Sequence, residues 1–295
     1  MDATDVLETL EITDWAGPFE PGLRARAADA LESGRVLVMP ALPFTLTPRE
    51  TPFLSQDASD ASRKNISLDP ATSRIKGTAF TGDEADRLSA MLNRYAEAAT
   101  GLLTGLIPGY ATGLERARTS FRPVEVQGRA LSQRRDDALL HVDAFPTRPM
   151  QGRRILRVFS NIAPDGAGRD WLVGEKFEPF AARYLSGLRR RPPGEALALA
   201  LLRLTRGKRS RYDEIMLSLH DAVKLDPEYQ ASAPRAAVTF MPGTTWITYT
   251  DQVLHAALAG RYALEQTFHL PVTSMTHPER TPLRVLERLS GQTLV

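Results

Sequence analysis

His141 and Asp143 stand two positions apart in the segment ALLHVDAF, whose apolar residues predict a β-strand. Side chains two apart in a strand point to the same face, so an imidazole and a carboxylate would project side by side. Such a pair is a half-site for a divalent metal ion, and the third ligand must come from elsewhere. His255 is the candidate, because it lies in a second strand-like segment, QVLHAAL, 112 positions after Asp143.

The other histidines fit the third position less well. His220 lies in a polar segment with helical spacing, and His269 and His277 lie near the chain end, with a proline after His277. Two imidazoles and one carboxylate form a facial triad, which leaves three positions of an iron ion open for a 2-oxo acid and O₂. The pattern predicts a mononuclear Fe(II) oxygenase. A surface histidine followed by an aspartate in a turn would give the same letters.

Arginine also occurs inside predicted strands. Arg157 in RILRVFSNI and Arg122 in SFRP have apolar or structured neighbours, and an arginine that faces a core must pair with an anion. A guanidinium fits the distal carboxylate of 2-oxoglutarate through two parallel donors, whereas an internal salt bridge is the simpler alternative. Arg261, six residues after His255, competes for this role.

Arg169 and Trp171 follow a GAG sequence and are predicted to lie in a loop. Arginine would suit an anionic group of a sugar-like substrate, and tryptophan would suit the face of a sugar ring. Ordinary packing of a loop is the alternative.

Periodicity predicts helices in the N-terminal part of the chain. Residues 21–32 have helical spacing that ends at Gly34, and Asp83 could cap a helix that runs to about Leu106. Between them, RVLVMPAL predicts a buried strand, and the polar, proline-containing residues 45–80 predict a long loop.

Short strands with tight turns follow from about residue 120. A helical insertion then precedes four further strands, namely RAAVTFMP, TWITYTD, QVLHAALAG and RYALEQTFHL. Such strands are typical of a jelly roll. We therefore expect an α+β chain with a double-stranded β-helix (jelly-roll, cupin-like) core, surrounding helices and a helical insertion. It would be one domain over residues 1–295, with a mostly helical part (1–115), jelly-roll strands (116–172 and 233–272) and the insertion (173–232).

Composition excludes several kinds of chemistry. The chain has no cysteine, which removes disulfides, zinc–thiolate sites, iron–sulfur clusters and thiol nucleophiles. The N-terminus carries acids where a signal peptide carries basic residues, and the most apolar stretch, residues 196–202, is too short to span a bilayer. We expect a cytoplasmic protein.

Positive charge is concentrated in residues 183–211. This basic segment contains nine Lys or Arg and one acid, a net charge of +8, so that the rest of the chain carries −6. Leu197, Leu201 and Leu204 have helical spacing within it. A solvated helical face is one interpretation, and peripheral contact with an anionic membrane surface is the other. Nucleic acid is disfavoured because Tyr184 is the one aromatic residue in the segment, which therefore lacks a series of aromatic residues for base stacking.

Three runs of the chain resemble a known family. They are LLHVDAFPTRPMQGRRILRVFSNIAP, GRDWLVGEKFEPFA and PGTTWITYTDQVLHAALAGRYALEQTF, and the resemblance spans roughly residues 120–270. The chain is similar to the Kdo hydroxylases, which are Fe(II)/2-oxoglutarate/O₂-dependent 3-hydroxylases of 3-deoxy-D-manno-oct-2-ulosonic acid (Kdo). The resemblance implies Fe(II), with 2-oxoglutarate and O₂ as cosubstrates. It also implies that the substrate is Kdo attached to lipid A, at the cytoplasmic face of the inner membrane, and that the product is the 3-hydroxylated sugar Ko.

The resemblance also implies roles for individual residues. His141, Asp143 and His255 would bind iron. We expect Arg157, with Asn161 and Arg261, to bind 2-oxoglutarate. Residues expected to bind the sugar are Arg122, Arg169 and Trp171. Two rival functions are a 2-oxoglutarate hydroxylase of another substrate, such as a protein side chain, and a non-catalytic sugar-binding barrel.

Overall fold

The computed structural model describes residues 1–60, 65–128, 132–188, 202 and 204–295. Within this part of the chain, eight strands form one sheet in the order β1–β2–β9–β6–β11–β5–β3–β4. The bounds of these strands, in sheet order, are Leu7–Thr9, Val36–Met39, Thr245–Tyr249, Arg154–Asn161, Ala263–Leu270, Glu115–Arg122, Ile66–Asp69 and Arg74–Lys76. All pairs are antiparallel except β1 with β2.

A second sheet of three described strands faces the first. Its order is β10–β7–β8, with bounds His255–Ala259, Arg169–Gly174 and Arg235–Phe240. Aromatic residues fill the space between the sheets, where Phe159 and Trp246 of the larger sheet stack at 5.2 Å and meet Trp171 of β7. The two sheets form the double-stranded β-helix that the sequence predicted.

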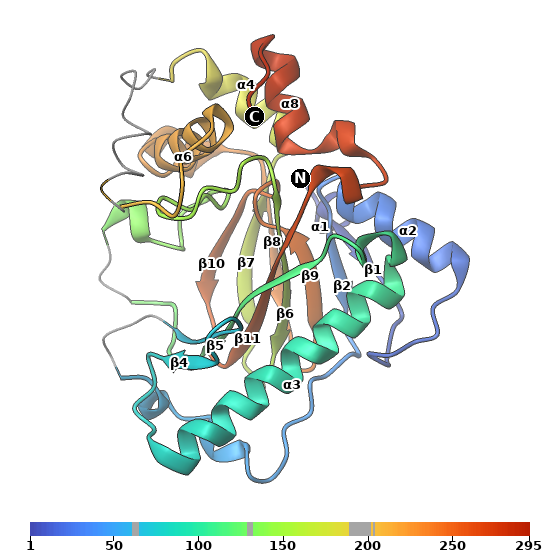
Figure 1. Cartoon of the computed structure of the whole chain (residues 1–295), viewed down its shortest axis with the longest axis vertical. Coiled ribbons are helices and arrows are strands. Elements are labelled where there is room, and N and C mark those ends of the chain that lie inside the picture. The colour runs from blue at the N-terminus through green and yellow to red at the C-terminus, as the bar shows by residue number, and fades with distance from the viewer. Residues whose placement is uncertain (61–64, 129–131, 189–201, 203) are drawn as a thin grey trace.

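Helices α2 (Pro21–Glu32) and α3 (Gly82–Leu106) cover the outer face of the larger sheet (Figure 1). Successive residues of a strand point to opposite faces, so Leu156 and Val158 of β6 pack against these helices. Arg157 and Phe159, which alternate with them, point between the sheets. The same strand therefore supports the core with one face and presents functional side chains with the other.

A second group of helices packs beside one end of the sheets, at the top of Figure 1. It consists of α4 (Phe177–Leu185), α6 (Arg211–Lys224), α7 (Pro227–Ser232) and the C-terminal α8 (Pro282–Ser290). Helices α4, α6 and α7 lie between β7 and β8 in sequence, where the insertion was expected. A short helix, α1 (Ala3–Val6), precedes β1.

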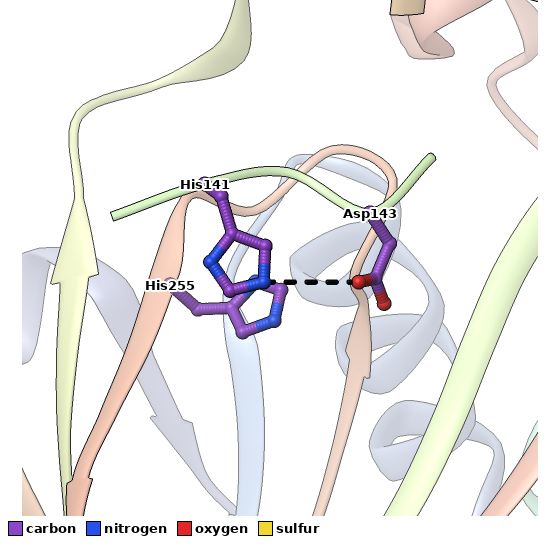
Figure 2. Close-up of side chains that lie close together, drawn as sticks. All are labelled: His141, Asp143 and His255. Carbon is purple, nitrogen blue, oxygen red and sulfur yellow. Dashed lines mark ion pairs between the residues drawn. The ribbon is translucent and has the colours of Figure 1, made fainter. Parts of the chain in front are cut away.

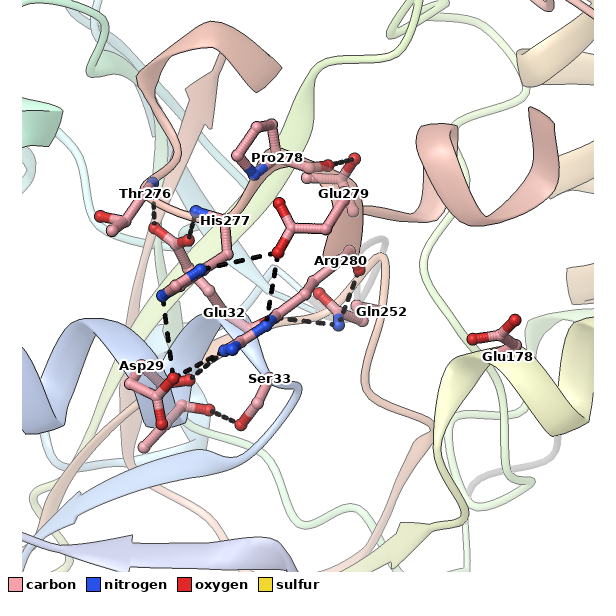
Figure 3. Close-up of polar contacts among 12 residues, drawn as sticks. Asp29, Glu32, Ser33, Glu178, Gln252, Thr276, His277, Pro278, Glu279 and Arg280 are labelled. Carbon is pink, nitrogen blue, oxygen red and sulfur yellow. Dashed lines mark hydrogen bonds and ion pairs between the residues drawn. The ribbon is translucent and has the colours of Figure 1, made fainter. Parts of the chain in front are cut away.

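The chain segment before α8 is tied to α2 by a buried carboxylate (Figure 3). Glu32 is 1% exposed and accepts hydrogen bonds from the backbone N–H groups of Thr276 and His277. It also accepts a hydrogen bond from the Tyr110 hydroxyl. Arg280 donates to Asp29 at 2.7 Å on the same side of α2. These charged hydrogen bonds join the two ends of the chain.

Several sequence predictions are wrong in detail. The predicted loop 45–80 contains β3 and β4, and the predicted loop around Arg169 and Trp171 is strand β7. The segment ALLHVDAF is not a strand, because only His141 forms a bridge with another strand residue. Helix α3 begins at Gly82 with Thr81 as its N-cap, so Asp83 lies in the first turn rather than at the cap.

Part of the basic segment lies outside the described residues. This part comprises residues 189–201 and 203, and therefore includes Arg189, Arg190, Arg191, Leu197, Leu201 and Arg203. Among the helices that are described, none combines the length and the apolar character needed to cross a membrane.

Candidate active site

His141 and His255 are brought together by a backbone bridge. The N–H group of His141 donates to the carbonyl of His255 at 3.0 Å, and the reciprocal bond is 2.9 Å. Their ring centroids are 4.6 Å apart. The pairing therefore places two imidazoles from distant parts of the chain side by side at the edge of the smaller sheet (Figure 2).

Both imidazoles are arranged as neutral ligands. Nδ1 of His141 lies 2.8 Å from the carbonyl oxygen of Leu139, and Nδ1 of His255 lies 2.9 Å from that of Val253. A carbonyl only accepts, so each Nδ1 carries the proton and each Nε2 keeps its lone pair. Burial lowers the pKa of both imidazoles, which favours the uncharged form that a metal ion requires.

Asp143 completes the group from the same segment as His141. Its N–H donates to the carbonyl of Thr250 at 2.7 Å, and its Oδ1 lies 3.8 Å from Nε2 of His141 (Figure 2). Burial alone would raise the pKa of this carboxyl, but the nearby Arg157 guanidinium and His255 hold it below its ordinary value. Asp143 is therefore an anionic oxygen ligand at neutral pH.

The donor set suits a divalent transition metal. One ligand atom from each of His141, Asp143 and His255 lies within 4.8 Å of the other two, and the group could hold a metal ion. Two neutral nitrogens and one carboxylate oxygen are the donors of non-haem Fe(II) sites with open positions. The residues therefore fit Fe(II).

A pocket of about 260 Å³ adjoins the three side chains. Arg122, Arg157, Arg169 and Trp171 all line it, as the sequence analysis proposed for a cosubstrate and a substrate. Phe159 and Ala257 supply apolar wall. The strands β5, β6, β7 and β10 thus each present at least one side chain to the same space.

Arg157 connects the iron site to a buried acid, Glu265. One of its terminal nitrogens lies 2.7 Å from Oδ2 of Asp143, and the other donates to Oε1 of Glu265. Arg122 donates to the second oxygen of Glu265, with Nε at 2.9 Å. Burial raises the pKa of Glu265, but Arg122 and Arg157 outweigh it and lower the pKa. The chain Asp143–Arg157–Glu265–Arg122 fixes one wall of the pocket.

The charge of the pocket fits a dianion together with a metal ion. Its charged lining consists of three arginines and three acids, namely Arg122, Arg157, Arg169, Asp137, Asp143 and Glu265. With neutral histidines these charges cancel, so Fe(II) would leave two positive charges. The two carboxylates of 2-oxoglutarate would neutralise them.

Trp171 offers a specific donor to such a ligand. Its ring stacks on His255 at 5.3 Å, and within the described structure its buried Nε1 has no hydrogen-bond partner. A buried indole N–H without a partner is costly, and a carboxylate oxygen would satisfy it. The pocket residues therefore fit 2-oxoglutarate.

Two of the residues expected to bind 2-oxoglutarate lie elsewhere. Arg261 is partly exposed, pairs with Asp165 at 2.5 Å and is not among the pocket-lining residues. Asn161 is buried, but its amide donates to the carbonyls of Ala167 and Phe240 and accepts from the N–H of Ala163. Its polar atoms are used within the fold, so neither residue is brought to the pocket.

Sequence reasoning missed two residues near the iron site. The His220 ring on α6 lies 5.5 Å from that of His141, a proximity that helical spacing does not reveal. Glu265 was also missed, although its position carried a signal. In RYALEQTFHL, polar Glu265 and Thr267 alternate with buried Leu264 and Phe268, which predicts a polar face toward the site.

Comparisons with known proteins agree with this geometry. A sequence model of the family described as 3-deoxy-D-manno-oct-2-ulosonic acid (Kdo) hydroxylase matches residues 14–293. The Kdo hydroxylase KdoO, solved with α-ketoglutarate and Fe(III), is 45% identical over 98% of this chain and 97% of that chain, with a TM-score of 0.95. KdoO with succinate and Fe(III) gives 45% identity, the same coverage and a TM-score of 0.94. Curated protein sequences give no match.

Proposed function

The chain belongs to the Kdo hydroxylase family of Fe(II)/2-oxoglutarate-dependent dioxygenases, and we propose that it hydroxylates C3 of Kdo carried on lipid A to give Ko. The observation that carries the proposal is the cluster of His141, Asp143 and His255, which lies beside a pocket that fits 2-oxoglutarate. A sugar-binding barrel without catalysis would not require this combination.

We assign the deep part of the pocket to the cosubstrate. Arg169 and Trp171 are 1% and 3% exposed, so a large glycolipid could not reach them. A small dianion can, and Arg122 lies in the same pocket. This assignment gives Arg169, Trp171 and Arg122 to 2-oxoglutarate, whereas the sequence analysis had reserved them for the sugar.

Arg157 has a second task in this proposal. Its ion pair holds the Asp143 carboxylate in one orientation while it also bonds Glu265. An oriented carboxylate keeps the iron ligands in a fixed geometry. Arg157 would thus support both the metal ligand and the charge balance of the cosubstrate pocket.

When bound, Fe(II) with 2-oxoglutarate and O₂ supplies the oxidising power that replaces a C–H bond by C–OH. The chain supplies the geometry and a dry environment. Trp171 and Phe159 form apolar walls beside His255, which limits the access of water to the reacting centre.

The proposal places the protein at the cytoplasmic face of an anionic membrane. Leu202 and Leu204 are 68% and 59% exposed and are close in sequence to Arg206 and Lys208. Exposed apolar side chains beside basic ones suit peripheral contact with a lipid headgroup layer. Such contact would raise the local concentration of a lipid-linked sugar.

Mass analysis of the sugar tests the function directly. The protein is incubated with Kdo-lipid A in the presence and absence of Fe(II) and 2-oxoglutarate, and succinate is measured in parallel. We expect one oxygen atom added to Kdo and a matching amount of succinate only in the complete mixture. Succinate formed with peptides but not with Kdo-lipid A would identify a different substrate and contradict the proposal.

A further inference from the structure

A second cavity, of about 280 Å³, shares a wall with the cosubstrate pocket. Arg157 and Glu265 line both spaces, so these two side chains form a wall that the second cavity shares with the pocket of His141, Asp143 and His255. Phe145, two residues after Asp143, forms another part of its wall. A group held in this cavity would lie beside the reacting centre without occupying the cosubstrate pocket.

The cavity carries an excess of positive charge. Arg118, Arg148 and Arg206 line it, and none of the three forms an ion pair with any acid that the structure describes. The acid in its lining, Glu265, is already bonded to Arg122 and Arg157. Nearby Glu115 is bonded to Arg153. The three arginines therefore have no anion of their own within the described chain.

A buried histidine supplies a further donor or acceptor. His269 lines the cavity, is 3% exposed, and its buried Nε2 has no hydrogen-bond partner in the described structure. Its Nδ1 lies 4.0 Å from Glu115, on the other side of the ring. Buried polar atoms normally have a hydrogen-bond partner, so a group bound in the cavity could supply the partner that Nε2 of His269 lacks.

We propose that this cavity is an anion-binding subsite, in which Arg118, Arg148 and Arg206, with His269, hold an anionic group of the substrate. The inference rests on the proposed function. Kdo is an ulosonic acid, so its C1 carboxylate lies two bonds from C3 and must sit near the iron when C3 reacts. A phosphate of the glycolipid offers the same chemistry, namely oxygen acceptors that match guanidinium donors.

The arginines can be tested in Arg148→Gln and in the double variant Arg118→Gln/Arg206→Gln. Arg49→Gln is the matched control, because Arg49 is an exposed arginine that lines neither the cavity nor the cosubstrate pocket. The substrates are Kdo-lipid A, its dephosphorylated form and its Kdo methyl ester, each in neutral detergent micelles to remove membrane attraction. Steady-state kinetics give KM and kcat, and circular dichroism monitors folding.

We expect both arginine variants to raise KM for Kdo-lipid A about tenfold, with the KM for 2-oxoglutarate unchanged. Arg49→Gln should resemble the wild type. If the difference between variant and wild type disappears with the dephosphorylated substrate, the bound group is phosphate. If it disappears with the methyl ester, the bound group is the C1 carboxylate. Equal KM values on Kdo-lipid A, or a difference that survives both modifications, would overturn the subsite.

A failure of the proposed function can be distinguished from a failure of the subsite, because in the first case the wild type would not oxidise Kdo-lipid A at all. In that case calorimetric titration with inorganic phosphate and with free Kdo still tests the cavity. Binding by the wild type that weakens about tenfold in Arg148→Gln supports the subsite. No binding to the wild type, or equal binding to both proteins, refutes it.

Discussion

Arg157 and Asp143 form a partly buried ion pair of 2.7 Å, which links a proposed iron ligand to the wall shared by two pockets. The same guanidinium bonds Glu265, so one cation stands between two carboxylates. Burial would lower the pKa of Arg157, but Asp143 and Glu265 raise it. The arginine is therefore permanently charged, and the two acids depend on it.

Arg157→Ala should impair both metal and cosubstrate binding. Removing the cation leaves Asp143 without its ion-pair partner and Glu265 with Arg122 alone, and breaking such a pair costs about 3 kcal/mol or more. We expect the 2-oxoglutarate requirement to rise about tenfold or more, because a charged hydrogen bond contributes about 1.5–3 kcal/mol. Succinate formation is measured across 2-oxoglutarate and Fe(II) concentrations. Arg261→Ala is the control, and a larger effect of that variant would show that the cosubstrate carboxylate has been misassigned.

Replacement of His141, Asp143 or His255 by Ala should abolish turnover while the fold survives. Each side chain offers one of three ligand atoms, and the pocket around them is otherwise built by the strands. Bound iron after anaerobic reconstitution, succinate production and circular dichroism are measured on each variant. His277→Ala is the control, because His277 lies in the segment before α8. Near wild-type turnover in any triad variant would remove that residue from the site.

The sequence predicted that His141, Asp143 and His255 lie together because two signals agreed. A period of two placed His141 and Asp143 on one face, and the strand β10 begins at His255. The prediction of a strand at His141 was nevertheless wrong. His141 and His255 form an isolated bridge there, so extended backbone rather than a continuous ladder sets the geometry. The local sequence pattern therefore identifies residues with an extended backbone but not the strands with which they pair.

Strand β7 shows why other elements escaped prediction. Arg169 and Trp171 after a GAG sequence were predicted to lie in a loop. In the strand, Arg169 lines the pocket, and Asp170 accepts a hydrogen bond from Thr239 on β8. Charged residues in a strand are compatible with burial only when they have hydrogen-bonding or ionic partners. Those partners are set by the tertiary structure and cannot be read from the local sequence. The proximity of His220 to His141 depends in the same way on how α6 packs, which periodicity does not specify.

Glu32→Gln should destabilise the protein without changing the chemistry. The Glu32 carboxylate accepts hydrogen bonds from the backbone of Thr276 and His277 (Figure 3) and from the Tyr110 hydroxyl. An amide can replace only part of this acceptor capacity. We expect a loss of about 1–3 kcal/mol in the free energy of unfolding. Urea denaturation measures the loss, and turnover well below the midpoint should stay near wild type. Glu279→Gln, at an exposed neighbouring acid, is the control, and equal midpoints for both variants would refute the role of Glu32.

His269 should make folding sensitive to mild acid. Burial and, to a smaller extent, the positive charge of Arg148 lower the pKa of His269 to about 4 in the folded protein. In the unfolded chain the pKa of a histidine is about 6.5. Near pH 7 the ring is neutral in both states. As the pH falls from 6.5 toward 4, the unfolded chain binds a proton that the folded protein does not, so stability is progressively lost, by at most about 3 kcal/mol. His269→Gln should therefore lose less stability than the wild type between about pH 7 and about pH 5 in urea denaturation of the metal-free protein. Identical pH dependences for wild type and His269→Gln would contradict the assignment.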